Sequence, residues 1–75
     1  MKIRKETIIR KNLGFPSIFK AESDGGLILM NFRMGVLKIY LEDKLILETS
    51  KDQFDISGYL SDEDLLMILE REQLI

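Results

Sequence analysis

The stretch "LILMNFRMGVLKIYLEDKLILET", residues 27–49, decides the fold of this 75-residue chain. Three apolar runs rich in Ile, Leu, Val, Tyr and Phe alternate in it with two short segments of turn-forming residues. Runs of this length and composition, bounded in this way, are typical of β-strands. We therefore expect strands over 27–32, 36–41 and 45–49, joined as an antiparallel meander.

Pairing these strands across three-residue turns at 33–35 and 42–44 sorts their side chains onto two faces, because successive residues of a strand point in opposite directions. In this register Lys38 lies opposite Glu48, which is a favourable cross-strand pair. A leucine face collects Leu27, Leu29, Asn31, Leu37, Ile39, Leu41, Leu45 and Leu47. An aromatic face collects Ile28, Met30, Phe32, Val36, Lys38, Tyr40, Ile46 and Glu48.

The N-terminal part of the chain adds strands to this meander. Partial alternation in "KIRKETIIR", residues 2–10, predicts a first strand. Pro16 lacks a backbone donor, so the next strand is expected to begin just after it, at an edge of the sheet. "SDGG", residues 23–26, predicts a tight hairpin turn, and pairing through it adds Phe19 and Ala21 to the aromatic face.

The C-terminal stretch "SDEDLLMILERE" predicts a helix over 62–73. Ser61 is a suitable N-cap, and acidic residues follow it at the positive end of the helix dipole. Leu60 and Leu65 occupy the two positions of a hydrophobic staple. One side of this helix, which would face the sheet, carries Leu65, Leu66, Ile68 and Leu69, whereas Met67 and Leu74 lie on the other side as a further candidate contact.

The predicted fold is therefore α+β, a single domain over residues 1–75. It is a small antiparallel meander of four to five strands, with one C-terminal helix packed on the leucine face. The segment 51–60 is expected to be a loop or short strand with Phe54, Ile56 and Tyr59 turned inward. One helix leaves the aromatic face uncovered, so either the sheet curls into a small barrel of the SH3 or OB type, or a partner covers that face.

Composition argues against an enzyme. Cysteine and histidine are absent, which removes the usual nucleophile, general base and transition-metal ligands, and there is no phosphate-binding glycine motif. The acidic pairs lack the spacing of a calcium loop. They are Glu42/Asp43, Asp52/Asp55 and Asp62/Asp64. We expect no cofactor and no metal.

The setting expected from the sequence is the cytoplasm. No signal peptide is recognised at the start, and the longest apolar runs are far shorter than the ~20 residues that a membrane span needs. The absence of cysteine fits a reducing compartment. We therefore expect no contact with a membrane.

These features predict a small non-enzymatic regulatory or inhibitory protein that acts through protein–protein contacts. Because a chain this small buries a limited core, a second copy is the expected cover for the aromatic face, as a homodimer, and a further unidentified protein partner is expected too. The candidate interface comprises Phe19, Ile28, Met30, Phe32, Val36, Tyr40 and Ile46.

Two alternatives follow from the charges. Residues 1–41 hold eight Lys and Arg against three Asp and Glu, whereas residues 42–75 hold three against ten. The basic half, together with sheet aromatics, is typical of single-stranded nucleic-acid binding, with contacts from Lys2, Arg4, Lys5, Arg10, Lys11, Arg33 and Lys38. The acidic half would suit a charge-mimic inhibitor of a nucleic-acid-binding protein, of the kind that phages encode, through Glu42, Asp43, Asp62, Glu63, Asp64 and Glu70.

Overall fold

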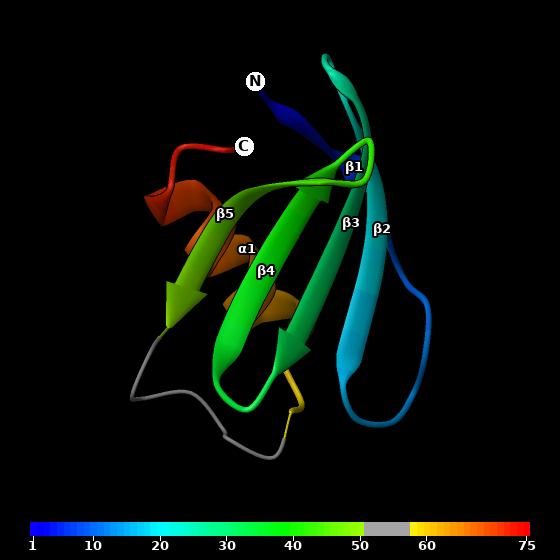
Figure 1. Cartoon of the computed structure of the whole chain (residues 1–75), viewed down its shortest axis with the longest axis vertical. Helices are drawn as coiled ribbons and strands as arrows, with labels where there is room; N and C mark the ends of the chain where they lie inside the picture. The colour runs from blue at the N-terminus through cyan, green and yellow to red at the C-terminus, as the bar shows by residue number, and fades with distance from the viewer. Residues whose placement is uncertain (51–57) are drawn as a thin grey trace.

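The computed structural model describes residues 1–50 and 58–75 (Figure 1). Five strands form one antiparallel sheet in chain order, and one helix follows them. The elements are β1 Ile3–Arg10, β2 Ser17–Ser23, β3 Gly26–Arg33, β4 Val36–Leu41, β5 Lys44–Ser50 and α1 Asp62–Arg71. The α+β meander with a C-terminal helix is confirmed. The inward placement predicted for Phe54 and Ile56 lies outside the described residues.

The sheet is open, with α1 on one face only (Figure 1). Each strand pairs with its neighbours in sequence, so β1 and β5 are the two edges. The barrel alternative is therefore not the one that this chain adopts in its described part. The other sheet face carries no helix or strand of the described chain, and we call it the open face.

The core lies between the sheet and α1. Its side chains come from alternate positions of the strands and from one side of the helix. Burying a large aliphatic or aromatic side chain contributes roughly 1.5–3 kcal/mol, so this layer supplies most of the driving force for folding. The buried residues are Ile3, Phe19, Ala21, Ile28, Met30, Phe32, Leu37, Ile39, Leu60, Leu65, Ile68 and Leu69.

Two-residue turns set the register of the last three strands. Arg33 pairs with Val36 around Met34 and Gly35, whose φ angles are 54° and 79°. The next turn likewise has two residues of positive φ, Glu42 and Asp43. Such left-handed pairs are the pattern of type I′ turns, whose twist matches that of the strands they join. The three-residue turns predicted from the sequence are wrong by one residue.

This shift exchanges the two faces of β4 relative to β3. Phe32 lies opposite Leu37, and Met30 lies opposite Ile39, all on the helix side. A one-residue change of register turns every side chain of a strand to the other face. The pairing of Phe19 and Ala21 with β3 is confirmed, since Phe19 lies opposite Met30 and Ala21 opposite Ile28.

The predicted exposure of the aromatic face is consequently wrong for most of its members. Four of the seven candidate interface residues are at most 2% exposed and form the core under the helix: Phe19, Ile28, Met30 and Phe32. They cannot contact a partner of the folded chain. The residues that replace them on the open face belong mainly to the predicted leucine face. The alternation along β3 is as predicted, but Leu27 and Leu29 point away from the helix and not toward it.

Both edge strands carry an irregularity. In β5 the register changes between the Ile39–Leu47 and Tyr40–Leu45 pairs, so Ile46 is an extra residue that forms a β-bulge. The predicted pairing of Lys38 with Glu48 lies beyond this bulge and is confirmed.

In β1 the register shifts between Arg4 and Ile9. Thr7 bridges the interruption, because its hydroxyl donates to the Arg4 carbonyl at 2.6 Å and accepts from the Glu22 N–H at 2.8 Å. β2 begins just after Pro16, as predicted, but it is not an edge strand, because it lies between β1 and β3. Pro16 is compatible with this position because it stands just outside the paired residues.

The start of α1 follows the sequence signals. Ser61 is the N-cap, and its hydroxyl accepts from the Asp64 N–H at 3.1 Å. Leu60 and Leu65, the residues of the predicted staple, are both buried. These contacts fix the angle at which the chain joins the helix.

The end of α1 differs from the prediction. Gln73 adopts a φ of 61°, and the Leu74 N–H returns to the Leu69 carbonyl at 2.8 Å, as in a Schellman motif. The chain then turns back, so Leu74 packs against the core and accepts the Ile3 N–H at 2.6 Å. The proposed outward contact through Leu74 is therefore wrong, because helical spacing no longer applies beyond residue 72. Met67 is exposed.

A substitution at the β3–β4 turn tests the register argument. Met34→Asn should raise the free energy of unfolding by about 1 kcal/mol, because asparagine tolerates the left-handed conformation that Met34 holds and forms with Gly35 the pair preferred in type I′ turns. Met34→Val should lower it by a similar amount, since β-branched residues resist positive φ. Urea unfolding of the three proteins measures both shifts. Equal stabilities would contradict the turn.

Candidate functional site

A row of side chains crosses all five strands on the open face. Ile9 pairs with Lys20, Lys20 with Leu29, Leu29 with Tyr40, and Tyr40 with Leu45. We call its apolar members, Ile9, Leu29, Tyr40 and Leu45, the apolar stripe. Lys20 stands among them, and its aliphatic stem can extend the apolar surface while its ammonium group reaches water.

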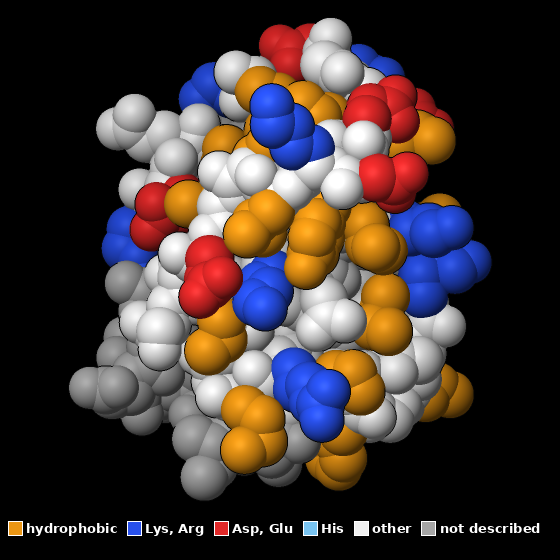
Figure 2. Space-filling view, viewed as in Figure 1, with side chains coloured by type: hydrophobic (Ala, Val, Ile, Leu, Met, Phe, Trp, Pro, Cys, Tyr) orange, Lys and Arg blue, Asp and Glu red, His pale blue; other side chains and the backbone are white. Residues whose placement is uncertain are grey.

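The apolar stripe is accessible. Ile9 is 60% exposed and Leu45 46% exposed, and Leu27, one row further along β3, is 62% exposed. Figure 2 shows hydrophobic side chains across the middle of this face, with Lys or Arg and also Asp or Glu side chains below them, further Lys or Arg above them, and Asp and Glu gathered toward the upper right. An apolar band bordered by charges in this way is typical of a surface that binds another protein.

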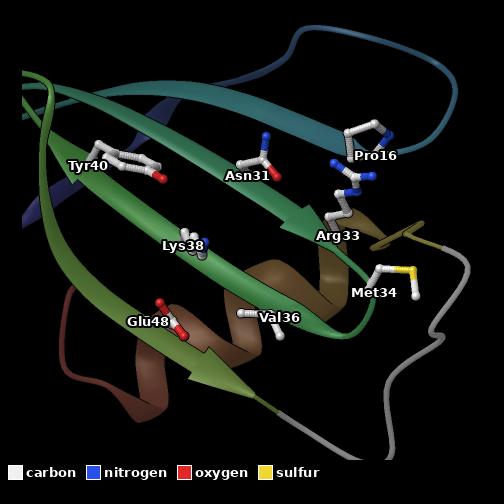
Figure 3. A pocket seen from close by; sticks show the side chains of 8 residues that line it. All are labelled: Pro16, Asn31, Arg33, Met34, Val36, Lys38, Tyr40 and Glu48. Atoms are coloured by element: carbon white, nitrogen blue, oxygen red, sulfur yellow. The ribbon is translucent and has the colours of Figure 1, made fainter.

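A first depression lies on one side of the apolar stripe, toward the β3–β4 turn (Figure 3). Its volume is about 440 Å³. It contains two cations, Arg33 and Lys38, and one anion, Glu48, and we call it the basic depression. In Figure 3 Arg33 extends toward Pro16, while Lys38 and Tyr40 follow each other along β4. Its remaining lining residues are Asn31, Met34 and Val36.

A second depression lies on the other side of the stripe, toward the β4–β5 turn, with a volume of about 550 Å³. Its charged lining consists of three carboxylates, Glu22, Glu42 and Asp43, and one cation, Lys20. We call it the acidic depression. Its apolar lining comes from Leu27, Leu29 and Ile9, so the apolar stripe forms the boundary between depressions of opposite charge.

Three of the predicted interface residues are available at the surface. Tyr40 belongs to the apolar stripe, Val36 lines the basic depression, and Ile46 is exposed at the bulge of β5. Ile9, Leu29 and Leu45 are also available as contact residues, which the sequence pattern did not indicate. The predicted alternation is correct within each strand, but the predicted register placed these leucines under the helix.

The predicted nucleic-acid contacts do not form one surface. Arg33 and Lys38 line the basic depression, whereas Lys5 and Arg10 line a groove between β1 and the start of α1. The rest are dispersed along β1 and its ends: Lys2 donates to the Gln73 carbonyl, Arg4 pairs with Glu22 at 3.4 Å, and Lys11 is exposed. Of the three aromatics expected to stack bases, Phe19 and Phe32 are buried and Tyr40 alone reaches the open face.

Arg10 is a structural residue. Its guanidinium donates to Asp62 at 2.9 Å, to the Ser17 hydroxyl at 3.3 Å and to the Leu60 carbonyl, and it lies 4.5 Å from the centre of the Phe19 ring. The Arg10 side chain is only 15% exposed. It thereby connects β1 and β2 to Leu60, just before α1, and to Asp62, the first residue of α1, and the sequence carried no signal for this role.

The Arg10 network generates a stability prediction. Arg10→Ala should lower the free energy of unfolding by about 2 kcal/mol, because it removes charge-assisted hydrogen bonds from a largely buried site. Asp62→Ala should cost less than about 1 kcal/mol, since its carboxylate is 77% exposed and well solvated. Chemical unfolding of both variants measures the difference. Equal losses would mean that the ion pair, and not the buried network, carries the effect.

The predicted charge-mimic residues are also divided. Glu42 and Asp43 form the β4–β5 turn in the upper part of Figure 1, whereas α1 begins in the lower half with Asp62, Glu63 and Asp64. Asp62 is paired with Arg10, and Glu70 lies two turns further along the helix. These carboxylates therefore do not line one continuous acidic surface.

Residues 1–50 and 58–75 bring together no group of three metal-binding side chains, and Asp52 and Asp55 lie outside them. Within the same residues no helix has the length and apolar character to cross a bilayer. Comparison with protein-family models, curated proteins and solved structures found no match.

Proposed function

We propose that this chain is a small non-enzymatic protein that acts through protein–protein contact, of the kind that regulates or inhibits a partner, and that it self-associates through the open face. The observation that carries the proposal is the apolar stripe, which has a member on β1, β3, β4 and β5 and in which Lys20 occupies the β2 position. The proposal keeps the cytoplasmic setting expected from the sequence.

The hydrophobic effect supplies the driving force. Removing apolar surface from water is favourable by about 25 cal/mol per Å². Five strands spaced about 4.8 Å apart span about 24 Å, and six residues of strand extend about 20 Å, so each open face offers about 500 Å². Two such faces bury about 1,000 Å² in total, which is near the lower limit of specific interfaces. Association in the micromolar range is therefore expected.

Sheet-on-sheet packing is the form that this contact takes in the proposal. Two open faces stacked about 10 Å apart would interdigitate their outward side chains, as the two sheets of a sandwich do. The helices would then lie on the outside of the assembly. Met67, exposed on α1, would stay in contact with water in this arrangement, so it serves as a control position.

Sedimentation velocity over a micromolar concentration series tests the proposal. The unmodified protein should show a concentration-dependent dimer, and Tyr40→Asp should shift it to monomer, because a carboxylate would have to be desolvated at the centre of the stripe. Met67→Asp is the matched control and should dimerise normally. The circular dichroism of all three proteins should agree.

A second substitution separates association from folding. Phe32→Asp should unfold the chain rather than dissociate it, since Phe32 is fully buried under α1. A strict monomer across the concentration series would overturn self-association. Salt-sensitive binding of that monomer to a short oligonucleotide would favour the nucleic-acid alternative instead.

A further inference from the structure

We infer that the partner copy is oriented by a two-fold axis parallel to the apolar stripe, so that the acidic depression of each copy covers the basic depression of the other. This inference rests on the proposed self-association and adds its geometry. Its basis is the position of the two depressions, which lie on opposite sides of one apolar boundary and carry opposite charge.

The charges involved are available for contact. Arg33 and Lys38 are exposed in the basic depression, and Glu42 and Asp43 are exposed at the acidic one. Within residues 1–50 and 58–75 the ion pairs are Arg4–Glu22 and Arg10–Asp62. None of the four exposed charges has an ion-pair partner in that part of the chain. Opposite charges brought together across an interface favour the matching orientation and disfavour others.

The charges of the two depressions determine the direction of the two-fold axis. Rotation about an axis parallel to the stripe places each strand over the same strand of the partner copy. The two strands then run in opposite directions. The β4–β5 turn, with Glu42 and Asp43, comes to lie over the Lys38 end of the partner's β4 and β5. Rotation about an axis parallel to the strands would instead keep the acidic ends of the two sheets together and the basic ends together. Such like-charge contacts oppose association.

Complementary charge reversal tests this orientation. One variant carries Arg33→Glu and Lys38→Glu, and the other carries Glu42→Lys and Asp43→Lys. In the inferred orientation each variant alone brings like charges together, so its dimer should weaken at least tenfold at low salt. An equimolar mixture should recover association to within a few fold of the unmodified protein, because both charged contacts are then restored.

Controls make each outcome decisive. The pair Lys5→Glu and Glu63→Lys reverses exposed charges away from the open face, and it should leave association unchanged. Thermal unfolding of every variant shows whether it is folded. Suppose that the unmodified protein dimerises. If the reversal variants then dimerise with undiminished affinity, or if their mixture stays monomeric, the inferred orientation is overturned and self-association stands. An unmodified protein that never dimerises would overturn both.

Discussion

The left-handed conformation of the residues between the last three strands is the constraint on which this structure depends. Met34 and Gly35 close one turn, and Glu42 and Asp43 close the next, each in two residues. Because side chains of a strand alternate with a period of two, the length of a turn determines which residues meet the helix. Phe32 and Leu37 lie in the core, and Leu29 and Tyr40 lie on the open face, as a direct consequence of these turns.

Much of the architecture could be read from local patterns. Apolar runs marked the strands, and the Ser61 cap and the Leu60–Leu65 staple marked the start of the helix, because each of these signals acts within a few residues. The β2–β3 pairing was also predictable, since "SDGG" at residues 23–26 marks a tight turn, and Ser23 pairs with Gly26 across it. The β3–β4 register was not: methionine rarely takes a positive φ, so nothing at position 34 indicated a turn of two residues rather than three.

The candidate site was harder to predict than the fold, because exposure depends on register and on contacts distant in sequence. The sequence pattern correctly predicts Tyr40 and Val36 at the surface, whereas it places Phe32 there through the same one-residue error. Arg10 illustrates the second limit: its partners Leu60 and Asp62 lie about fifty residues away. The order of charged residues along the chain cannot distinguish a buried arginine with a structural role from an exposed arginine that contacts a ligand.

The irregular edge strands bear on how large an assembly can become. A straight, unpaired strand offers its backbone groups to another chain, and repetition of that pairing produces fibres. Here Ile46 interrupts β5, and the segment between Arg4 and Ile9 interrupts β1, so neither border is a regular template. Both borders of the sheet are thus poorly suited to the open-ended addition of strands that builds fibres.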